Sequence, residues 1–236
     1  MHRSSILRMN WFVDNYITQV NGNKKLKVLD VGSYDVNGSY KHLFSEDYFK
    51  YYGLDMEAGP NVDLVLKNPY QWDELNTDSF DIIISGQAFE HIEFFWITMS
   101  EMTRVLKKDG LMCIIAPNVL EEHRYPVDCY RFFTDGMIAL ARYVCLEPLH
   151  AHTNLAPSHN HKQWYSEYCT DSMLVARKNY SGEAKYVNLQ KYACVPAVHA
   201  ELNSNFVSPP KQSFLIRGLR KIDIIFKNML NLKSDR

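Results

Sequence analysis

Short apolar runs alternate along residues 27–178 with segments whose apolar positions recur every three or four residues. The runs predict strands, and the recurring positions predict helices. Because the strands are apolar throughout and are separated by helices, the pattern favours an α/β fold whose mostly parallel sheet is covered on both faces. The expected strands are 27–31, 51–54, 63–66, 80–85, 111–116, 146–150 and 172–176, and the expected helices are 4–21, 40–44, 94–106 and 135–143. The last strand is expected to be antiparallel, at or near an edge.

The periodic pattern weakens after Lys178, so we expect one domain over residues 1–178 and an extension over residues 179–236. The extension is irregular at first and regains helical spacing over residues 214–232. Its last segment, residues 211–236, holds seven Lys or Arg against two Asp. A basic amphipathic helix can lie on an anionic membrane surface. Packing on the protein's own core, or on a second subunit of a homodimer, is the favoured use.

Composition narrows the classes of protein to consider. Hydrophobic residues make up 46% of the chain and charged residues 22%, which is typical of a globular protein. The formal net charge is −1, so the chain lacks the basic surplus of a nucleic-acid-binding protein, and we expect no nucleic-acid partner. The five cysteines include no C-x-x-C pair, and no signal peptide or membrane-spanning run is evident. These features predict a cytoplasmic protein with reduced thiols.

Candidate chemistry begins at "KVLDVGSYDVNGSYKHLF", where the first strand ends on Asp30 and Gly32. A glycine lets the backbone turn sharply and approach a ligand, and the end of a parallel strand is where ligands bind in α/β sheets. The second strand ends on Asp55, a position from which a carboxylate can bind ribose hydroxyls. Each residue alone could serve the turn geometry or cap a helix. Together they indicate a ribose-containing cofactor, although the absence of G-x-G-x-x-G disfavours a dinucleotide.

The segments "VLDVGS", "GLDMEAGPNVDLV", "SFDIIISGQAFEHI", "EMTRVLKKDGLMCIIAPN" and "HRYPVDCYRFF" together resemble class I S-adenosylmethionine-dependent methyltransferases of the small-molecule type found in surface-polysaccharide biosynthesis. The resemblance implies a Rossmann-like, doubly wound sheet of seven strands. It also implies S-adenosyl-L-methionine as cofactor, with S-adenosyl-L-homocysteine as product. The cofactor-binding positions it implies are Asp30, Gly32, Ser33, Asp55, Met56, Asn68, Ser85, Gly86 and Gln87. The loop departs from the family pattern at Tyr34 and Val36, where further glycines are usual.

Methyl transfer to a hydroxyl also requires that the hydroxyl proton be removed, and a base within hydrogen-bond reach can do this. His91 follows the fourth strand in "AFEHIEFF", and His123 and Asp128 lie in the polar loop after the fifth strand. We take these three residues as the catalytic candidates. The alternatives are that Glu90 and His91 only hold the next helix, and that the loop is simply solvated. The loop's aromatic rings and arginines suit a sugar or a phosphorylated acceptor.

Four histidines, His150, His152, His159 and His161, fall close together in "HAHTNLAPSHNH". The first two would share one face of a strand. Without a carboxylate or thiolate at a known spacing, a polar wall beside the acceptor is preferred to a metal site, and we assign no metal. Cys113 and Cys145 are expected to act as small core residues.

The sequence thus favours a methyltransferase that uses S-adenosylmethionine on a small acceptor, which we expect to be a hydroxyl of a sugar or of a sugar-linked or phosphorylated precursor of a surface polysaccharide. One alternative is a non-catalytic module of the same fold, recruited through its basic tail. Another is a nicotinamide-dependent oxidoreductase, which the missing glycine pattern disfavours. Cofactor binding distinguishes the three.

Overall fold

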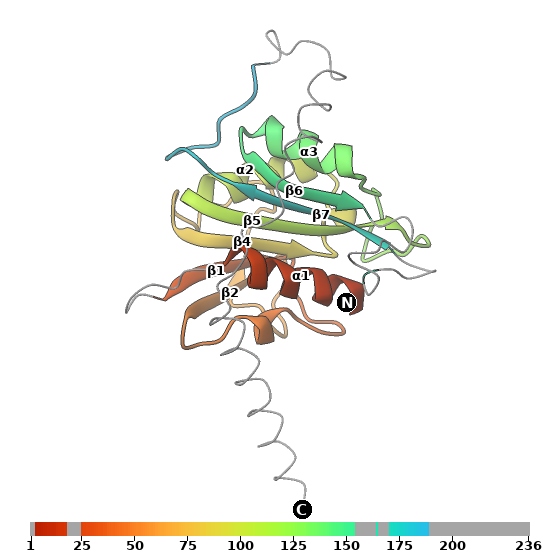
Figure 1. Ribbon diagram of the computed structural model, residues 1–236. Coiled ribbons are helices and arrows are strands. Elements are labelled where there is room, and N and C mark those ends of the chain that lie inside the picture. The colour runs from red at the N-terminus through yellow and green to blue at the C-terminus, as the bar shows by residue number, and fades with distance from the viewer. Residues whose placement is uncertain (1–2, 18–24, 154–163, 165–169, 189–236) are drawn as a thin grey trace, which may run out of the picture.

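The computed structural model describes residues 3–17, 25–153, 164 and 170–188 (Figure 1). These residues form a single sheet with helices packed against it. The strands are β1 (Leu26–Val31), β2 (Phe49–Asp55), β3 (Leu64–Val65), β4 (Phe80–Gly86), β5 (Leu106–Val119), β6 (Glu147–Thr153) and β7 (Thr170–Arg177). The helices are α1 (Arg3–Tyr16), α2 (Phe95–Val105) and α3 (Thr134–Tyr143), with short 3-10 turns η1 (Lys41–Leu43) and η2 (Phe89–His91).

The sheet has seven strands in the order β3-β2-β1-β4-β5-β7-β6. The first five of these are parallel to one another, whereas β7 runs antiparallel between β5 and β6. The strand order reverses between β1 and β4, the place where α/β proteins bind ligands. The predicted Rossmann-like, doubly wound and mostly parallel sheet is therefore confirmed. The last strand is antiparallel and next to the edge, and β6 forms the edge itself.

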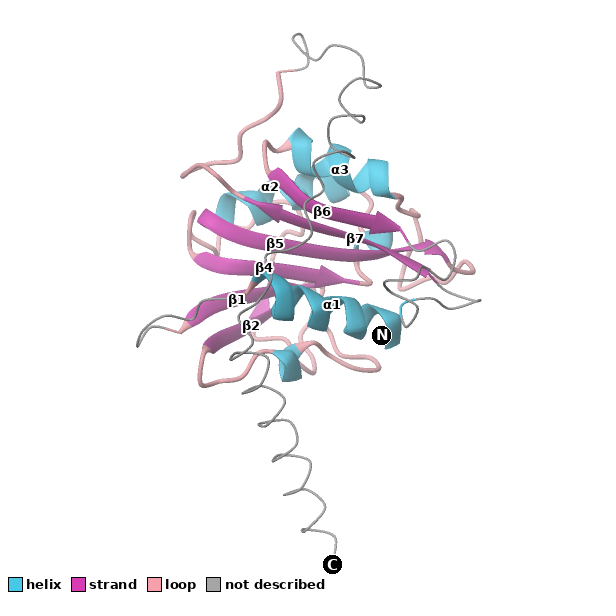
Figure 2. Cartoon of the chain, in the orientation of Figure 1, coloured by secondary structure: helices cyan, strands magenta, loops and turns pink. Residues whose placement is uncertain are grey.

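Helices cover both faces of the sheet, so the core has two layers (Figure 2). On one face α1 packs through Met9 and Phe12 against Val28, Ile82 and Ile84. The other face carries α2 and α3, whose buried residues join Leu29, Ile83 and Ile114 in the second cluster. Alternate residues of β1 and β4 thus enter opposite layers, as the side-chain alternation of a strand requires. Burial on both faces explains why the central residues of these strands are apolar on both sides.

Some boundaries differ from the predicted ones. The helix expected at residues 40–44 is only the 3-10 turn η1, and β5 is longer at both ends than residues 111–116. Helix α1 ends at Tyr16, and residues 18–21 of the predicted helix lie outside the described residues. The predicted C-terminal helix 214–232 also lies outside them. No helix in the described ranges is both long and apolar enough to span a bilayer. Cys113, Cys129 and Cys145 are free thiols.

Lys178 is a buried charged residue just beyond β7, and its ammonium group is fully enclosed. It donates hydrogen bonds to the Asp78 carboxylate at 2.8 Å, to the Leu106 carbonyl at 2.8 Å and to the Gly182 carbonyl at 2.7 Å. The backbone N–H of Lys178 also donates to the Gly110 carbonyl, and the Lys178 carbonyl accepts the N–H of Asp109. Lys178 therefore joins the end of the sheet to the chain that follows it.

Replacing Lys178 with methionine keeps the length of the side chain but leaves these acceptors without this donor. We expect Lys178→Met to lower the free energy of unfolding by about 1–3 kcal/mol, the usual cost of unpaired buried polar groups. Urea denaturation measures the change. Lys67→Met is the control, because the Lys67 side chain is 89% exposed. Equal stability of the two variants would contradict a structural role for Lys178.

Candidate active site

The turn after β1 is anchored to the end of β2. The backbone N–H groups of Gly32 and Ser33 both donate to the Leu54 carbonyl, at 2.9 and 3.1 Å. Gly32 has φ +77°, and a Cβ atom there would lie only 2.4 Å from the Cβ of Ala88. The glycine is thus required both by its positive φ and by the close approach of the chain leaving β4. This turn brings the ends of three adjacent strands together.

Asp55, the last residue of β2, faces the same turn. Its Oδ2 accepts the N–H of Tyr34 at 2.9 Å, and its Oδ1 accepts the N–H of Met56 at 2.7 Å. A carboxylate has about four lone-pair sites, so each oxygen retains the capacity to accept a further hydrogen bond. Asp55 is only partly buried, and it is the side chain predicted to bind ribose hydroxyls.

The end of β4 supplies Ser85, Gly86 and Gln87. The Ser85 hydroxyl donates to the Val31 carbonyl at 2.8 Å, and thus bridges β4 to β1. A Cβ on Gly86 would lie 1.9 Å from the Tyr40 hydroxyl oxygen, so this glycine makes room for a fully buried ring. Gln87 has φ +59°, and its buried Oε1 has no hydrogen-bond partner among the described residues. That oxygen is an acceptor available to a donor on a ligand.

Asp30 lies one residue before the end of β1 and is 3% exposed. It accepts a short hydrogen bond from the Tyr51 hydroxyl. Burial raises the pKa of the Asp30 carboxyl to about 7; the Tyr51 hydrogen bond opposes this shift, and the Asp55 charge adds to it. The Ser33 hydroxyl donates to the Asn61 carbonyl at 3.1 Å, and the Asn61 amide returns a bond to the Ser33 carbonyl at 3.0 Å.

Two other predicted cofactor residues lie on the surface nearby. Met56 follows Asp55 and is 54% exposed, so its side chain is free to pack on a ligand. Asn68 is exposed in the turn after β3, where its Oδ1 accepts the N–H of Tyr70 at 2.9 Å. The structure therefore brings Gly32, Ser33 and Asp55 together at one turn, but gives Asn68 a local capping bond of its own.

The first turns of α1 reach the same end of the sheet (Figure 2), which the sequence did not indicate. Asp171 at the start of β7 is fully buried and accepts bonds from Ser4, Arg8 and Gln87, at 2.8, 3.3 and 3.0 Å respectively. The guanidinium of Arg8 also donates to the Asp171 carbonyl at 3.2 Å. The available signal in the sequence was a charged residue on the otherwise apolar face of the helix. Arg8 lies on this face next to Met9, and both residues are buried. This network fixes Gln87.

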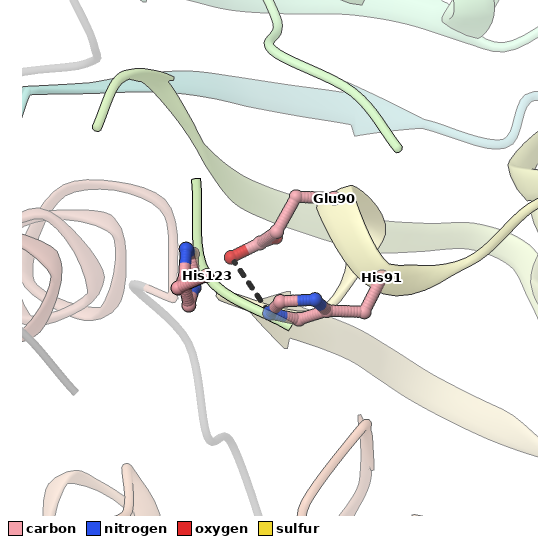
Figure 3. Close-up of side chains that lie close together, drawn as sticks. All are labelled: Glu90, His91 and His123. Carbon is pink, nitrogen blue, oxygen red and sulfur yellow. Dashed lines mark ion pairs between the residues drawn. The ribbon is translucent and has the colours of Figure 1, made fainter. Parts of the chain in front are cut away.

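Glu90, His91 and His123 lie close together in the segments that follow β4 and β5 (Figure 3). Glu90 and His91 belong to η2, and His123 comes from the loop after β5. The Glu90 Oε1 lies 3.7 Å from the His91 Nε2, and the His91 and His123 ring centroids are 4.9 Å apart. Burial raises the pKa of Glu90 to about 8 and lowers the pKa of His91. The two predicted histidines are therefore neighbours, and Glu90 joins them.

The Asp128 carboxylate is hydrogen-bonded within the loop and does not face solvent. Its side chain is 1% exposed, and Arg131 Nη2 donates to its Oδ2 at 2.7 Å. The N–H of His123 donates to the same oxygen at 2.7 Å. The Arg131 hydrogen bonds hold the pKa of Asp128 well below its usual range. The carboxylate thus fixes the backbone position of His123.

The two histidines of β6 do not belong to the group formed by Glu90, His91 and His123. His150 and His152 share one face of the strand, as predicted, with ring centroids 6.2 Å apart. They pack against aromatic rings, with His150 4.8 Å from Trp11 and His152 6.2 Å from Trp164. His159 and His161 lie outside the described residues.

Comparison with known proteins adds to this geometry. Residues 29–114 match the family model described as a methyltransferase domain. This match covers the second half of β1, all of β2, β3 and β4, most of β5, and the Gly32, Asp55 and Gln87 positions. The comparison with curated protein sequences finds no match.

Solved structures share the fold at low sequence identity. An S-adenosylmethionine-dependent methyltransferase from Archaeoglobus fulgidus has TM-score 0.52 and 14% identity, covering 74% of this chain and 95% of that one. The 1,6-didemethyltoxoflavin-N1-methyltransferase of Burkholderia thailandensis, solved with its acceptor and S-adenosylhomocysteine, has TM-score 0.53 and 16% identity, covering 75% and 80%. The [4+2]-cyclase SpnF has TM-score 0.53 and 14% identity, covering 72% and 80%. At such identities the likeness shows the fold alone.

The match to a methyltransferase-domain model over residues 29–114, together with the shared fold, supports a methyltransferase enzyme. The cofactor that the sequence resemblance implies is S-adenosylmethionine. The chain's own residues fit that cofactor. Gly32 keeps the first turn open, Asp55 retains acceptor capacity at the end of β2, and the Gln87 Oε1 is a buried acceptor at the end of β4. These three groups lie at the ends of adjacent strands, where the strand order reverses.

Proposed function

We propose that this protein methylates a hydroxyl group of a small acceptor, namely a sugar or a sugar-linked or phosphorylated precursor of a surface polysaccharide, in the cytoplasm. The observation that carries the cofactor part is the Asp55 carboxylate beside the Gly32 turn, within the segment that matches the methyltransferase family model. The acceptor part is drawn from the sequence resemblance and from the residues around the histidines.

The cofactor-binding set consists of nine residues from the ends of β1, β2 and β4 and the turn after β3. Asp55 would accept hydrogen bonds from the ribose hydroxyls, and Met56 would pack beside the adenine ring, with Asn68 near the ring's edge. The methionine part would lie toward Asp30, Gly32 and Ser33 and toward Ser85, Gly86 and Gln87. When bound, S-adenosylmethionine supplies a methyl group already activated on a sulfonium, so the protein's main task is orientation.

The acceptor side is formed by the loop after β5, which carries exposed rings. Tyr125 is 67% exposed, and its ring lies 6.1 Å from that of His123. Phe133 is 52% exposed at the end of the same loop. Rings of this kind can cover the face of a sugar, and the exposed Arg124 guanidinium can bind a phosphate or carboxylate.

In this proposal His91 or His123 would take the proton that the acceptor hydroxyl loses. The Nδ1 atom of His91 lies 2.5 Å from the Val127 carbonyl and that of His123 lies 3.2 Å from the Glu121 carbonyl. A carbonyl only accepts, so these contacts suit the tautomer that carries its hydrogen on Nδ1 and leaves the Nε2 lone pair for a proton. We assign Asp128 a positioning role, because its contacts hold His123 in place.

Calorimetric titration of the purified chain tests the proposal. We expect saturable binding of S-adenosylmethionine and S-adenosylhomocysteine and none of NAD, the control ligand. A screen of nucleotide sugars and glycans with S-adenosylmethionine would then identify the acceptor by mass gain of one methyl group. Binding of NAD alone, or of none of the three, would overturn the methyltransferase reading. Cofactor binding without transfer to any acceptor would favour the non-catalytic alternative.

A further inference from the structure

Three side chains with metal-binding atoms meet at the acceptor end of the site. Glu90, His91 and His123 each place one ligand atom within 4.8 Å of the others (Figure 3). Two ligands come from one 3-10 turn and the third from a loop 32 positions further along the chain, and the carboxylate and the imidazoles point toward a common region. Among the described residues, no such group is found at His150 and His152.

Glu90 is the unusual member of this group. It is fully buried, yet neither carboxylate oxygen has a hydrogen-bond partner among the described residues. Burying a carboxylate without a partner is costly, and such groups in proteins are normally paired or bound to a metal. The neighbouring cation, Arg131, is engaged by Asp128 instead. A positive ion between Glu90 and the two rings would supply the missing partner.

The outer contacts of the histidines are those of metal ligands. A metal-bound histidine typically donates its other ring N–H to a carbonyl or a carboxylate, which fixes the tautomer. Here the Nδ1 atoms of His91 and His123 face the Val127 and Glu121 carbonyls, and Asp128 Oδ2 lies 3.4 Å from the His123 Nδ1. Both Nε2 lone pairs are therefore left for an ion.

We propose that Glu90, His91 and His123 bind a divalent transition-metal cation through one carboxylate oxygen and two imidazole nitrogens. Two imidazoles and a carboxylate suit zinc, iron or manganese rather than calcium or magnesium. Ligand atoms around such an ion stand about 3.3 Å apart, given metal–ligand distances of about 2.0–2.1 Å. The Glu90–His91 separation of 3.7 Å is already close to this, and a small rotation of the partly exposed His123 ring, with its backbone held by Asp128, would close the remaining gap.

Three protein ligands leave open positions, which is the arrangement of catalytic rather than structural metal sites. An acceptor oxygen could take one of them, and the ion would lower the pKa of a hydroxyl bound to it. The ion would then take over the role assigned above to the free Nε2 atoms. This use of the site rests on the proposed function, whereas binding of the ion itself does not.

The test is calorimetric titration of the chelator-treated, dialysed full chain with zinc chloride and with manganese chloride. We expect one equivalent of at least one ion to bind. Glu90→Gln, which keeps the shape of the side chain, and His123→Ala, which changes a loop residue, should each weaken binding by more than the roughly 10- to 100-fold cost of losing an outer-shell partner. His42→Ala, which removes an exposed histidine outside this group, is the histidine-removal control and should bind as wild type does.

Absence of equimolar binding, or unchanged binding in both Glu90→Gln and His123→Ala, would overturn the metal site. Thermal melts of each variant without added metal establish that it is folded. Titration of the same samples with S-adenosylhomocysteine separates the two proposals, because the cofactor residues lie outside the metal set. Cofactor binding without metal binding would remove only the metal site, and metal binding without cofactor binding would remove only the proposed function.

Discussion

Asp55→Ala is expected to weaken S-adenosylhomocysteine binding by about 10- to 100-fold, because each hydrogen bond to a charged acceptor is worth about 1.5–3 kcal/mol. The Asp55 carboxylate ends β2, and both of its oxygens keep lone-pair capacity after accepting the N–H groups of Tyr34 and Met56. Removing it deletes the ribose acceptor and leaves those two N–H groups without their partner. Calorimetric titration of the variant measures the loss.

Two variants separate the ribose contact from the shape of the turn. Asp55→Asn keeps the size of the side chain but loses the charge, so its affinity should fall between that of wild type and Asp55→Ala. Asp47→Ala is the matched control, since Asp47 is an exposed aspartate that contacts Ser45 in the turn before β2. If Asp55→Ala bound as tightly as Asp47→Ala, the ribose assignment would be wrong.

The sheet could be predicted because its strands carry an unambiguous pattern. Residues 27–31 and 80–85 are mostly apolar, because alternate side chains of β1 and β4 are buried in the two opposite layers of the core. The antiparallel direction of the last strand was also predicted. Its insertion between β5 and β6 could not be, because that placement depends on which strands pair across more than fifty residues of sequence.

The candidate site was only partly predictable for the same reason. Gly32 and Asp55 can be predicted because each stands at the end of a strand, and the carboxyl ends of parallel strands lie on the same side of a sheet. The approach of His123 to Glu90 depends on how the loop after β5 folds back, and no spacing in the sequence encodes it. For Glu90 the sequence suggests no more than the alternative role of holding the next helix. Only its burial, with both oxygens unpartnered, sets it apart from an ordinary surface glutamate.

We expect the largest loss of stability from a substitution that disrupts the hydrogen bonds around Asp171. Arg8 and Asp171 form an ion pair at 3.3 Å in which both side chains are fully buried. Removing one partner of such a pair leaves a buried charge uncompensated and typically costs about 3–5 kcal/mol. We therefore expect Arg8→Met to lower the free energy of unfolding by about that amount, measured as a lower urea midpoint with an unchanged slope. Arg3→Met, on the exposed start of the same helix, should change it by less than about 0.5 kcal/mol.

The same substitution should reach the cofactor site, because Asp171 also holds Gln87. The Gln87 Nε2 donates to Asp171 Oδ1 at 3.0 Å, so an aspartate released from Arg8 no longer fixes the chain that leaves β4. At a temperature where the variant is still folded, S-adenosylhomocysteine affinity should fall in Arg8→Met and stay at the wild-type value in Arg3→Met. A large loss of stability with unchanged affinity would show that α1 supports the fold alone. Stability within about 1 kcal/mol of wild type would contradict the ion pair's role altogether, since the expected cost is several times larger.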